Sequence, residues 1–308
     1  MKLAMVFPGQ GSQSVGMLGG YQDLPEVIEL LLEAKSALGS DFIRLLDEGP
    51  AESLNLTLNT QPAMLVAGYA AYRAWLALGG PRPEIVAGHS LGEYSALVAA
   101  GALAFRDALP LVRFRAQAMQ EAVPQGTGAM AAILGLDDQA VSQACAEAQG
   151  AVQAVNFNAP GQVVIAGEKA AVERAVLLCK SRGAKRAMPL PVSAPFHSSL
   201  MQPAGERLEQ HLQDVDIAAP RISLINNIDV RIETNPQAIR DALVRQASGP
   251  VRWAETIRRM AELGATHIIE CGPGKVLAGL TKRISPDTQS LALADRASLE
   301  QALEAVKG

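Results

Sequence analysis

The stretch Ile85-Val-Ala-Gly-His-Ser-Leu-Gly-Glu-Tyr-Ser-Ala96 runs from a short apolar segment, through a serine flanked by glycines, into a sequence of helical character. Its centre, Gly88–Gly92, fits the pattern G-x-S-x-G, in which a serine stands on a sharp turn between a strand and a helix. The turn projects the Ser90 hydroxyl above the sheet, and the Leu91 N–H faces a developing oxyanion from the helix N-terminus. The stretch predicts an α/β fold with a nucleophilic serine where a strand of the sheet ends and a helix begins. A glycine-rich turn without chemistry is the alternative.

Outward from this turn, short apolar runs alternate with longer stretches of helical periodicity, as is typical of a mostly parallel sheet covered by helices. The candidate strands are Leu3–Phe7, Ile85–Gly88, Ile222–Ile225 and His267–Glu270. The candidate helices are Gln61–Leu78, Gly92–Ala100, Asp107–Ala122, Pro236–Gln246 and Trp253–Leu263.

Residues 126–192 break this alternation. The predicted order is strand (Ala129–Gly135), helix (Asp138–Ala148), strand (Val152–Asn158), strand (Gln162–Ala166), helix (Ala170–Arg182) and strand (Lys185–Val192). The turn Asn158–Gly161 joins the two middle strands as a hairpin, and the βαββαβ order is that of a ferredoxin-like unit. We therefore predict a large α/β domain of residues 1–125 and 193–308, with a small ferredoxin-like domain of residues 126–192 inserted in it.

The composition excludes several classes of protein. Of the 308 residues, 49% are hydrophobic and 19% are charged, which excludes intrinsic disorder as the main state. The net charge of −4, from 27 Lys and Arg against 31 Asp and Glu, leaves no basic footprint for nucleic acid. The longest apolar stretch, Ala96–Phe105, is about half of the roughly 20 residues that a membrane-spanning helix needs. We expect neither nucleic acid nor membrane as a partner.

Cysteine usage and the N-terminus indicate the compartment. Cys145, Cys179 and Cys271 lie far apart and form no CxxC pair, as expected for buried thiols in a reducing compartment. The apolar run before Pro8 is too short for a signal peptide. We therefore expect a cytoplasmic protein. No cluster of His, Cys, Asp or Glu has metal-ligand spacing, so no metal is expected.

A serine nucleophile needs a base, and the chain has four histidines. His89 lies beside the serine in the turn, His211 lies in a polar helical stretch, and His267 begins a buried strand. His197 lies in a loop at the end of the predicted insertion, where functional residues concentrate. It is the leading candidate for the base, although a structural histidine is the alternative.

Arg115 occupies an unexpected position on the predicted helix 107–122. It lies on the apolar stripe with Leu111, Ala118 and Met119, where a guanidinium needs an anionic partner. The partner is either an Asp or Glu of the protein or a substrate carboxylate gripped by two hydrogen bonds, and the side chain could instead reach the helix edge.

Two glycine-rich loops are candidate ligand sites. Gly9–Gln13 falls short of a dinucleotide-binding fingerprint, but its backbone N–H groups could supply a second oxyanion donor. Cys271–Lys275 resembles a phosphate loop only superficially, and a simple turn is the favoured interpretation.

Taken together, several motifs resemble those of the bacterial malonyl-CoA:acyl-carrier-protein transacylases of type II fatty-acid synthesis. In chain order the motifs are Phe7–Gln13, Gln61-Pro62, Gly88–Gly92, Arg115, Pro195–His197, Asp241–Gln246 and Gly272–Lys275. The resemblance covers almost the whole chain. It implies an α/β-hydrolase-like large domain with a mostly parallel sheet and an inserted ferredoxin-like domain.

The resemblance also implies a role for each site residue. Ser90 would be the nucleophile, His197 the base and Arg115 the ligand of the malonyl carboxylate. The backbone N–H groups of Gln10 and Leu91 would form the oxyanion hole. The implied reaction transfers malonyl from malonyl-CoA to the phosphopantetheine thiol of acyl carrier protein, through a malonyl-serine intermediate and without a cofactor of the enzyme's own.

Further residues are implied around the base. Gln246 would lie near His197 and help to orient it, so that an amide and backbone carbonyls take the place of a carboxylate. Phe196 and Met119 would line the acyl pocket. Phe196 is similar to a bulky residue of malonyl-selective acyltransferases, which implies discrimination against methylmalonyl-CoA.

An acidic carrier protein requires a local basic surface on this acidic chain. The resemblance favours Lys282 and Arg283 for docking. A second basic run comprises Lys180, Arg182, Lys185 and Arg186. Charges that only solvate helix ends are the alternative for both. A monomer is expected.

Three other functions remain open from the sequence. The same transfer could serve polyketide synthesis or malonate decarboxylation, which the residues do not distinguish. A serine esterase or thioesterase would need a catalytic acid and leaves Arg115 unexplained. A carrier-protein-binding module without catalysis would not need Ser90.

Overall fold

The larger of two sheets has five strands in the order β7-β2-β1-β8-β9, and every neighbouring pair is parallel. The computed structural model describes residues 1–192 and 194–307. The strands are β1 (Leu3–Phe7), β2 (Ile85–Gly88), β7 (Ser223–Leu224), β8 (His267–Glu270) and β9 (Gln289–Ala292). The predicted mostly parallel sheet is confirmed, and β1, β2 and β8 have the expected bounds.

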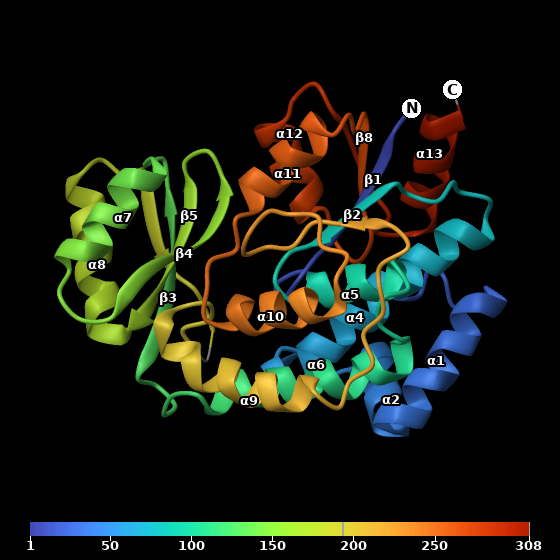
Figure 1. The fold of residues 1–308 in the computed structure, drawn as a ribbon, viewed down its shortest axis with the longest axis horizontal. Helices are drawn as coiled ribbons and strands as arrows, with labels where there is room; N and C mark the ends of the chain where they lie inside the picture. The colour runs from blue at the N-terminus through green and yellow to red at the C-terminus, as the bar shows by residue number, and fades with distance from the viewer. Residues whose placement is uncertain (193, 308) are drawn as a thin grey trace.

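Helices cover both faces of this sheet (Figure 1). They are α1 (Pro25–Leu38), α2 (Ser40–Glu48), α3 (Ala51–Leu54), α4 (Thr57–Ala77), α5 (Gly92–Ala99), α6 (Phe105–Glu121), α9 (Gln202–Leu212), α10 (Pro236–Ala247), α11 (Trp253–Glu262), α12 (Val276–Ile284) and α13 (Arg296–Lys307). A short 3₁₀ helix, η1 (Ser199–Met201), precedes α9.

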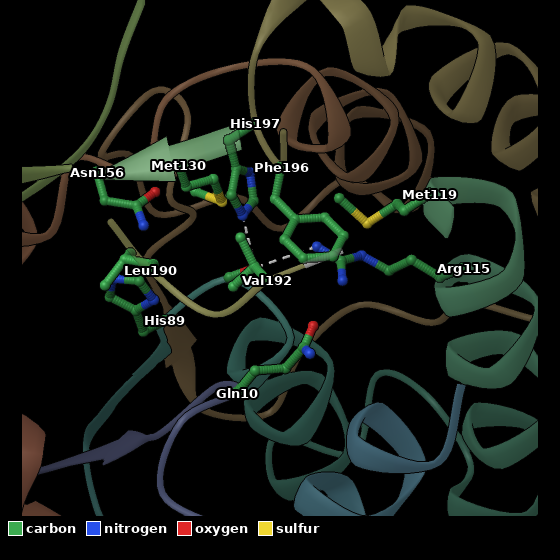
Figure 2. A pocket seen from close by; sticks show the side chains of 11 residues that line it. Gln10, His89, Arg115, Met119, Met130, Asn156, Leu190, Val192, Phe196 and His197 are labelled. Carbon is green, nitrogen blue, oxygen red and sulfur yellow. Dashed lines mark hydrogen bonds between the residues drawn. The ribbon is translucent and has the colours of Figure 1, made fainter. Parts of the chain in front are cut away.

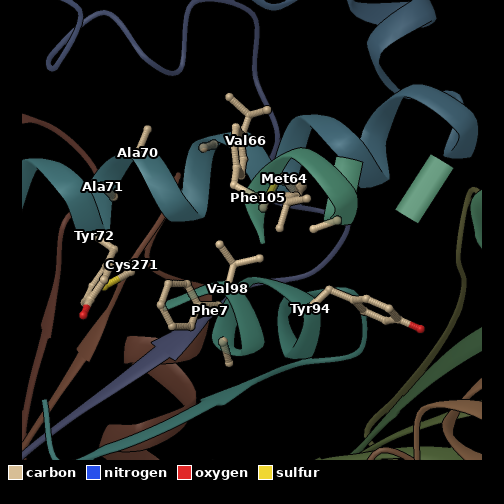
Figure 3. Close-up of a cluster of buried hydrophobic side chains, with 14 of the residues drawn as sticks. Phe7, Met64, Val66, Ala70, Ala71, Tyr72, Tyr94, Val98, Phe105 and Cys271 are labelled. Carbon is tan, nitrogen blue, oxygen red and sulfur yellow. The ribbon is translucent and has the colours of Figure 1, made fainter. Parts of the chain in front are cut away.

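Successive residues of β1 enter two different cores, because strand side chains alternate between the faces of a sheet. Met5 and Phe7 pack with α4 and α5, as Figure 3 shows around Phe7. Ala4 and Val6 pack on the opposite face with α11 and α12. All five residues of β1 are buried. The sheet is therefore the middle layer of three.

The second sheet is antiparallel, with the order β4-β5-β3-β6. Its elements are β3 (Gly128–Leu134), α7 (Asp138–Glu147), β4 (Val152–Ala159), β5 (Gln162–Glu168), α8 (Lys169–Ser181) and β6 (Arg186–Pro189). Val163 and Ile165 face α7 and α8, whereas Val164 and Ala166 face a core shared with α6 and α9. The sheet and its two helices form one end of the molecule (Figure 1).

The expected βαββαβ order is present within residues 128–189. The last strand, Arg186–Pro189, is shorter than the predicted Lys185–Val192, and the Leu190 N–H that follows it still donates to the Met130 oxygen of β3. The domain limits at 126 and 192 remain predictions. Ser193 and Gly308, where the second part of the large domain was predicted to begin and end, lie outside the described residues.

Other elements differ from the sequence-based expectations. Helices α1–α3, α12 and α13 and strand β9 were not predicted, only the helical stretch around His211 was predicted of α9, and β7 is shorter than Ile222–Ile225. No helix of the described chain is both long and apolar enough to span a bilayer.

Candidate active site

Ser90 stands on the turn between β2 and α5 in the left-handed backbone region, with a φ of 52°. Such a conformation is strained for a residue with a side chain and is typical of functional turns. The residues that flank Ser90 must be glycines, because neighbouring backbone atoms leave no space for a Cβ at either position. A Cβ on Gly88 would lie 1.8 Å from the carbonyl carbon of Gly92, and one on Gly92 would lie 2.0 Å from the Phe7 oxygen. This packing presents the Ser90 hydroxyl at the carboxyl end of the sheet.

His197 contacts the serine directly. Its Nε2 lies 2.7 Å from the Ser90 Oγ, and its Nδ1 lies 2.8 Å from the backbone oxygen of Gln246. Because a carbonyl oxygen only accepts hydrogen bonds, Nδ1 carries the proton and Nε2 is free to accept from the serine hydroxyl. His197 has a φ of 65°, a second strained position in the site.

The imidazole is held in its neutral form. Burial, and the nearby Arg115 guanidinium, lower the pKa of His197 to about 3. A neutral imidazole is the form that accepts a proton. The resemblance implied that an amide and backbone carbonyls orient the ring; the backbone oxygen of Gln246 bonds to it, but the Gln246 side chain is directed elsewhere.

Arg115 is 1% exposed and has amide rather than carboxylate partners. Its Nη1 donates to the Gln61 Oε1 at 2.8 Å, and its Nη2 donates to the Gln246 Oε1 at 2.9 Å and to the Ser90 Oγ at 3.2 Å. The guanidinium also lies over the Tyr94 ring, 5.4 Å from its centroid. None of the ion pairs among the described residues includes Arg115. A buried cation therefore lies beside the serine without a carboxylate in direct contact, and the nearby Glu93 carboxyl acts on it from behind the Gln246 amide.

The loop after β1 approaches the serine turn closely. A Cβ on Gly9 would lie 2.7 Å from the His89 oxygen and 3.8 Å from the Leu91 nitrogen. Only glycine allows this approach, which brings the loop carrying Gln10 against the backbone of Leu91. Leu91 directly precedes the first residue of α5. The two residues expected to form an oxyanion hole are thus brought together.

These residues open into one pocket between the two sheets (Figure 2). Its lining comprises Gln10, His89, Ser90, Arg115, Met119, Met130, Asn156, Leu190, Val192, Phe196 and His197. Met119 and Phe196, the expected acyl-pocket residues, are both present. Met130 and Asn156 come from β3 and β4, so the antiparallel sheet supplies one wall.

Sequence reasoning missed this second wall and the polar groups behind the site. Asn156 has a buried Oδ1 without a hydrogen-bond partner. Asn227 accepts from the Ser90 N–H at 2.8 Å and donates from its amide to the Gly88 oxygen at 2.6 Å. Asn227 follows the predicted strand 222–225, and its position at a carboxyl end of the parallel sheet was the available signal.

The two residues expected to dock a carrier protein lie on α12. Lys282 is exposed. Arg283 is also exposed, but its guanidinium bonds to the Gln162 side chain and to the Pro160 oxygen in the β4–β5 hairpin. Lys282 is therefore the freer of the two charges. Among the described residues no group of His, Cys, Asp and Glu is arranged to hold a metal ion.

Comparison with known proteins agrees with this geometry. Residues 4–295 match the family model of the acyl transferase domain. The chain is 56% identical over 301 residues to the malonyl CoA-acyl carrier protein transacylase of Haemophilus influenzae, with 96% of each chain covered.

Solved structures are similar over nearly the full length. The acyl-carrier-protein S-malonyltransferase of Burkholderia pseudomallei is 64% identical, with a TM-score of 0.97 over 99% of this chain and 100% of that one. A malonyl-transacylase in complex with its type II PKS acyl-carrier protein is 52% identical, with a TM-score of 0.97 and the same coverage. The chain therefore belongs to the acyl transferase family, in the group of the malonyl CoA-acyl carrier protein transacylases.

Proposed function

We propose that the protein transfers a malonyl group from malonyl-CoA to the phosphopantetheine thiol of an acyl carrier protein. The observation that carries the proposal is the buried Arg115 guanidinium, whose Nη2 lies 3.2 Å from the Ser90 Oγ and which makes no direct ion pair with an acid of the described residues. A substrate carboxylate beside the reacting carbonyl would supply the missing negative charge.

In the first half-reaction the Ser90 Oγ attacks the thioester carbon of malonyl-CoA while the His197 Nε2 takes the hydroxyl proton. The oxygen that becomes negative is stabilised by the N–H groups of Gln10 and Leu91, each worth about 3 kcal/mol. The carbon–sulfur bond then breaks, and the coenzyme A sulfur takes the proton from His197. A malonyl-serine ester remains.

The second half-reaction reverses these steps with a new thiol. His197 takes the proton of the phosphopantetheine thiol, and the sulfur attacks the ester carbon. The bond to the Ser90 Oγ breaks, and the serine recovers its proton from His197. Because one product leaves before the second substrate enters, the kinetics are ping-pong.

Arg115 has donors to spare for the malonyl carboxylate. A guanidinium has five N–H donors, and three hydrogen bonds from Arg115 are seen, one of them to the serine itself. A carboxylate entering the pocket can replace the serine as a partner of Nη2, and this also frees the hydroxyl for attack. Acetyl groups have no carboxylate and gain nothing from this residue.

The proposal extends to partners and setting. The enzyme would need no cofactor of its own and would act as a monomer in the cytoplasm. Its three cysteines are buried free thiols, as is common in a reducing compartment. An acidic carrier protein would dock beside the pocket, near Lys282 and Arg283 on α12.

The pathway has two candidates. Fatty-acid elongation is the first, since the relatives in Haemophilus influenzae and Burkholderia pseudomallei carry the malonyl transferase names given above. Supply of a type II polyketide synthase is the second, because the malonyl-transacylase solved with a PKS carrier protein is 52% identical to this chain. A serine esterase is disfavoured, since His197 is oriented by the Gln246 carbonyl rather than by an acid.

The test is transfer itself. The enzyme is mixed with malonyl-CoA and a phosphopantetheinylated acyl carrier protein, and malonylated carrier protein and free malonate are both measured. We expect carrier-protein malonylation to exceed hydrolysis, and to be lost in Ser90→Ala and His197→Ala. Malonate as the main product would contradict the proposal.

A further inference from the structure

Glu93 is a buried carboxylate that the proposed reaction does not use. It lies three residues after Ser90 in the first turn of α5 and is 2% exposed. Burial raises the pKa of its carboxyl to about 7. None of the ion pairs among the described residues includes it. Burying a carboxyl group costs stability, which only its hydrogen bonds can offset.

Two hydrogen bonds reach Glu93, and both end on the same oxygen. The Asn227 backbone N–H donates to Oε2 at 3.0 Å, and the Gln246 Nε2 donates to Oε2 at 2.8 Å. Both donors belong to residues that are 0% exposed. The contacts join α5 to α10 and to the segment after β7.

Two acceptors fix which way the Gln246 amide faces, because its Nε2 donates to the Glu93 Oε2 at 2.8 Å and, at the longer distance of 3.1 Å, to the Ser90 backbone oxygen. The Glu93 oxygen accepts from Nε2, so Oε1 is directed to the opposite side, where it accepts from the Arg115 Nη2 at 2.9 Å. The Arg115 guanidinium only donates, so a reversed amide would set donor against donor. Glu93 thus acts on Arg115 through a single intervening amide.

The geometry points to Glu93 as the positioning residue that holds the Arg115 guanidinium toward the acyl pocket through the Gln246 amide, and so maintains the preference for a carboxylated acyl group. This inference rests on the proposed function, because it assigns the malonyl carboxylate to Arg115. Glu93 touches neither the substrate nor the reacting atoms.

The experiment compares Glu93→Met, which fills a similar volume without an acceptor, with Glu93→Gln. An amide oxygen of Glu93→Gln can replace Oε2 for both donors, and the Asn227 N–H fixes its orientation. The measurement is kcat/KM for malonyl-CoA and for acetyl-CoA, with melting temperatures recorded in parallel. We expect Glu93→Met to lower the malonyl-to-acetyl ratio about tenfold, and Glu93→Gln to stay within about threefold of the parent.

Equal losses for both acyl groups in Glu93→Met would show a purely structural role and overturn the inference. Should Glu93→Met not fold, Glu93→Asp makes the same test, because the retracted carboxylate no longer reaches the Gln246 amide; an unchanged ratio there overturns it equally. Arg115→Met separates the two proposals. If Arg115→Met lowers the ratio and the Glu93 variants do not, only the inference fails, whereas if Arg115→Met leaves the ratio unchanged, the proposed function fails.

Discussion

At the scale of single residues, the environment of His197 sets how the enzyme responds to pH. Burial lowers the pKa of His197 to about 3, well below its ordinary value of 6.5. The neutral form, which accepts the serine proton, therefore persists as the pH falls through 6.5. Because His197 has the lower pKa in the folded state, the unfolded chain binds the proton more readily. The free energy of unfolding therefore decreases as the pH falls from 6.5 toward 3.

We predict that acylation of Ser90 by acetyl-CoA keeps most of its rate at a pH about one unit below the ordinary pKa of histidine. Acetyl-CoA is chosen because it does not engage Arg115. Pre-steady-state release of coenzyme A across the pH range, on enzyme that circular dichroism shows to be folded, checks this. A rate that halves near pH 6.5 would contradict it.

Arg115 should carry the selectivity for malonyl. Arg115→Met removes the buried cation. It should lower kcat/KM for malonyl-CoA by an amount that corresponds to a loss of about 3 kcal/mol in transition-state stabilisation, while kcat/KM for acetyl-CoA changes little. Arg113→Met, on the opposite face of α6, is the matched control and should leave both rates unchanged. Parallel losses for malonyl-CoA and acetyl-CoA in Arg115→Met would refute this role.

The sequence predicted some residues of this site and not others, for physical reasons. Arg115 was noticeable because helical periodicity placed a guanidinium on an apolar stripe. The resemblance implied that Gln246 lies near His197, but matching motifs do not show whether its backbone carbonyl or its side-chain amide bonds to the ring. Asn156 and Met130 come from the antiparallel sheet, and only tertiary packing brings them to Ser90.

At the scale of elements, the strand–turn–helix at Ser90 was predictable because its constraints are local. Gly88 and Gly92 are fixed by atoms of the turn and of the adjacent β1. Strand β9 has no comparable signal, since Gln289–Ala292 is a short edge strand without a fully buried residue. Helix α12 begins directly after the turn Cys271–Lys275. The sequence indicates the turn, but it does not indicate that a helix follows.

Gly92→Ala should disrupt this turn. The new Cβ would lie 2.0 Å from the Phe7 oxygen, so the backbone must shift. We expect a loss of at least about 2 kcal/mol in the free energy of unfolding, together with loss of transferase activity.

Gly279→Ala is the control for this substitution. A Cβ at position 279 meets nothing within 4 Å, and the residue lies inside α12. It should stabilise the protein by up to about 1 kcal/mol. Chemical denaturation of both variants tests the pair, and a Gly92→Ala protein as stable and active as the parent would show that the turn is not constrained as described.

At the scale of the whole molecule, the site depends on two sheets of different kinds. The parallel sheet carries the serine turn, and the antiparallel sheet supplies the wall with Met130 and Asn156. The sequence predicted both sheets from the break in the strand–helix alternation. It did not predict that Leu190 and Val192, which follow β6, line the pocket, because that depends on how the sheets meet.

Carrier-protein docking is a property at this scale. Lys282→Glu should raise the KM for acyl carrier protein about threefold to tenfold, because the new carboxylate would face the acidic surface of the carrier protein. The KM for malonyl-CoA should not change. Lys35→Glu, an exposed lysine on α1, makes the same charge change on a different surface and should have no effect. Steady-state kinetics with the carrier protein as varied substrate decide this. Equal effects of the two variants would remove α12 as the docking surface.

A covalent malonyl ester on Ser90 is the feature on which the whole mechanism depends, and it can be detected in the intact mass of the protein after incubation with malonyl-CoA alone. We expect the protein to gain one malonyl group and Ser90→Ala to gain none. Wild-type protein without an adduct, or an adduct that persists in Ser90→Ala, would contradict it.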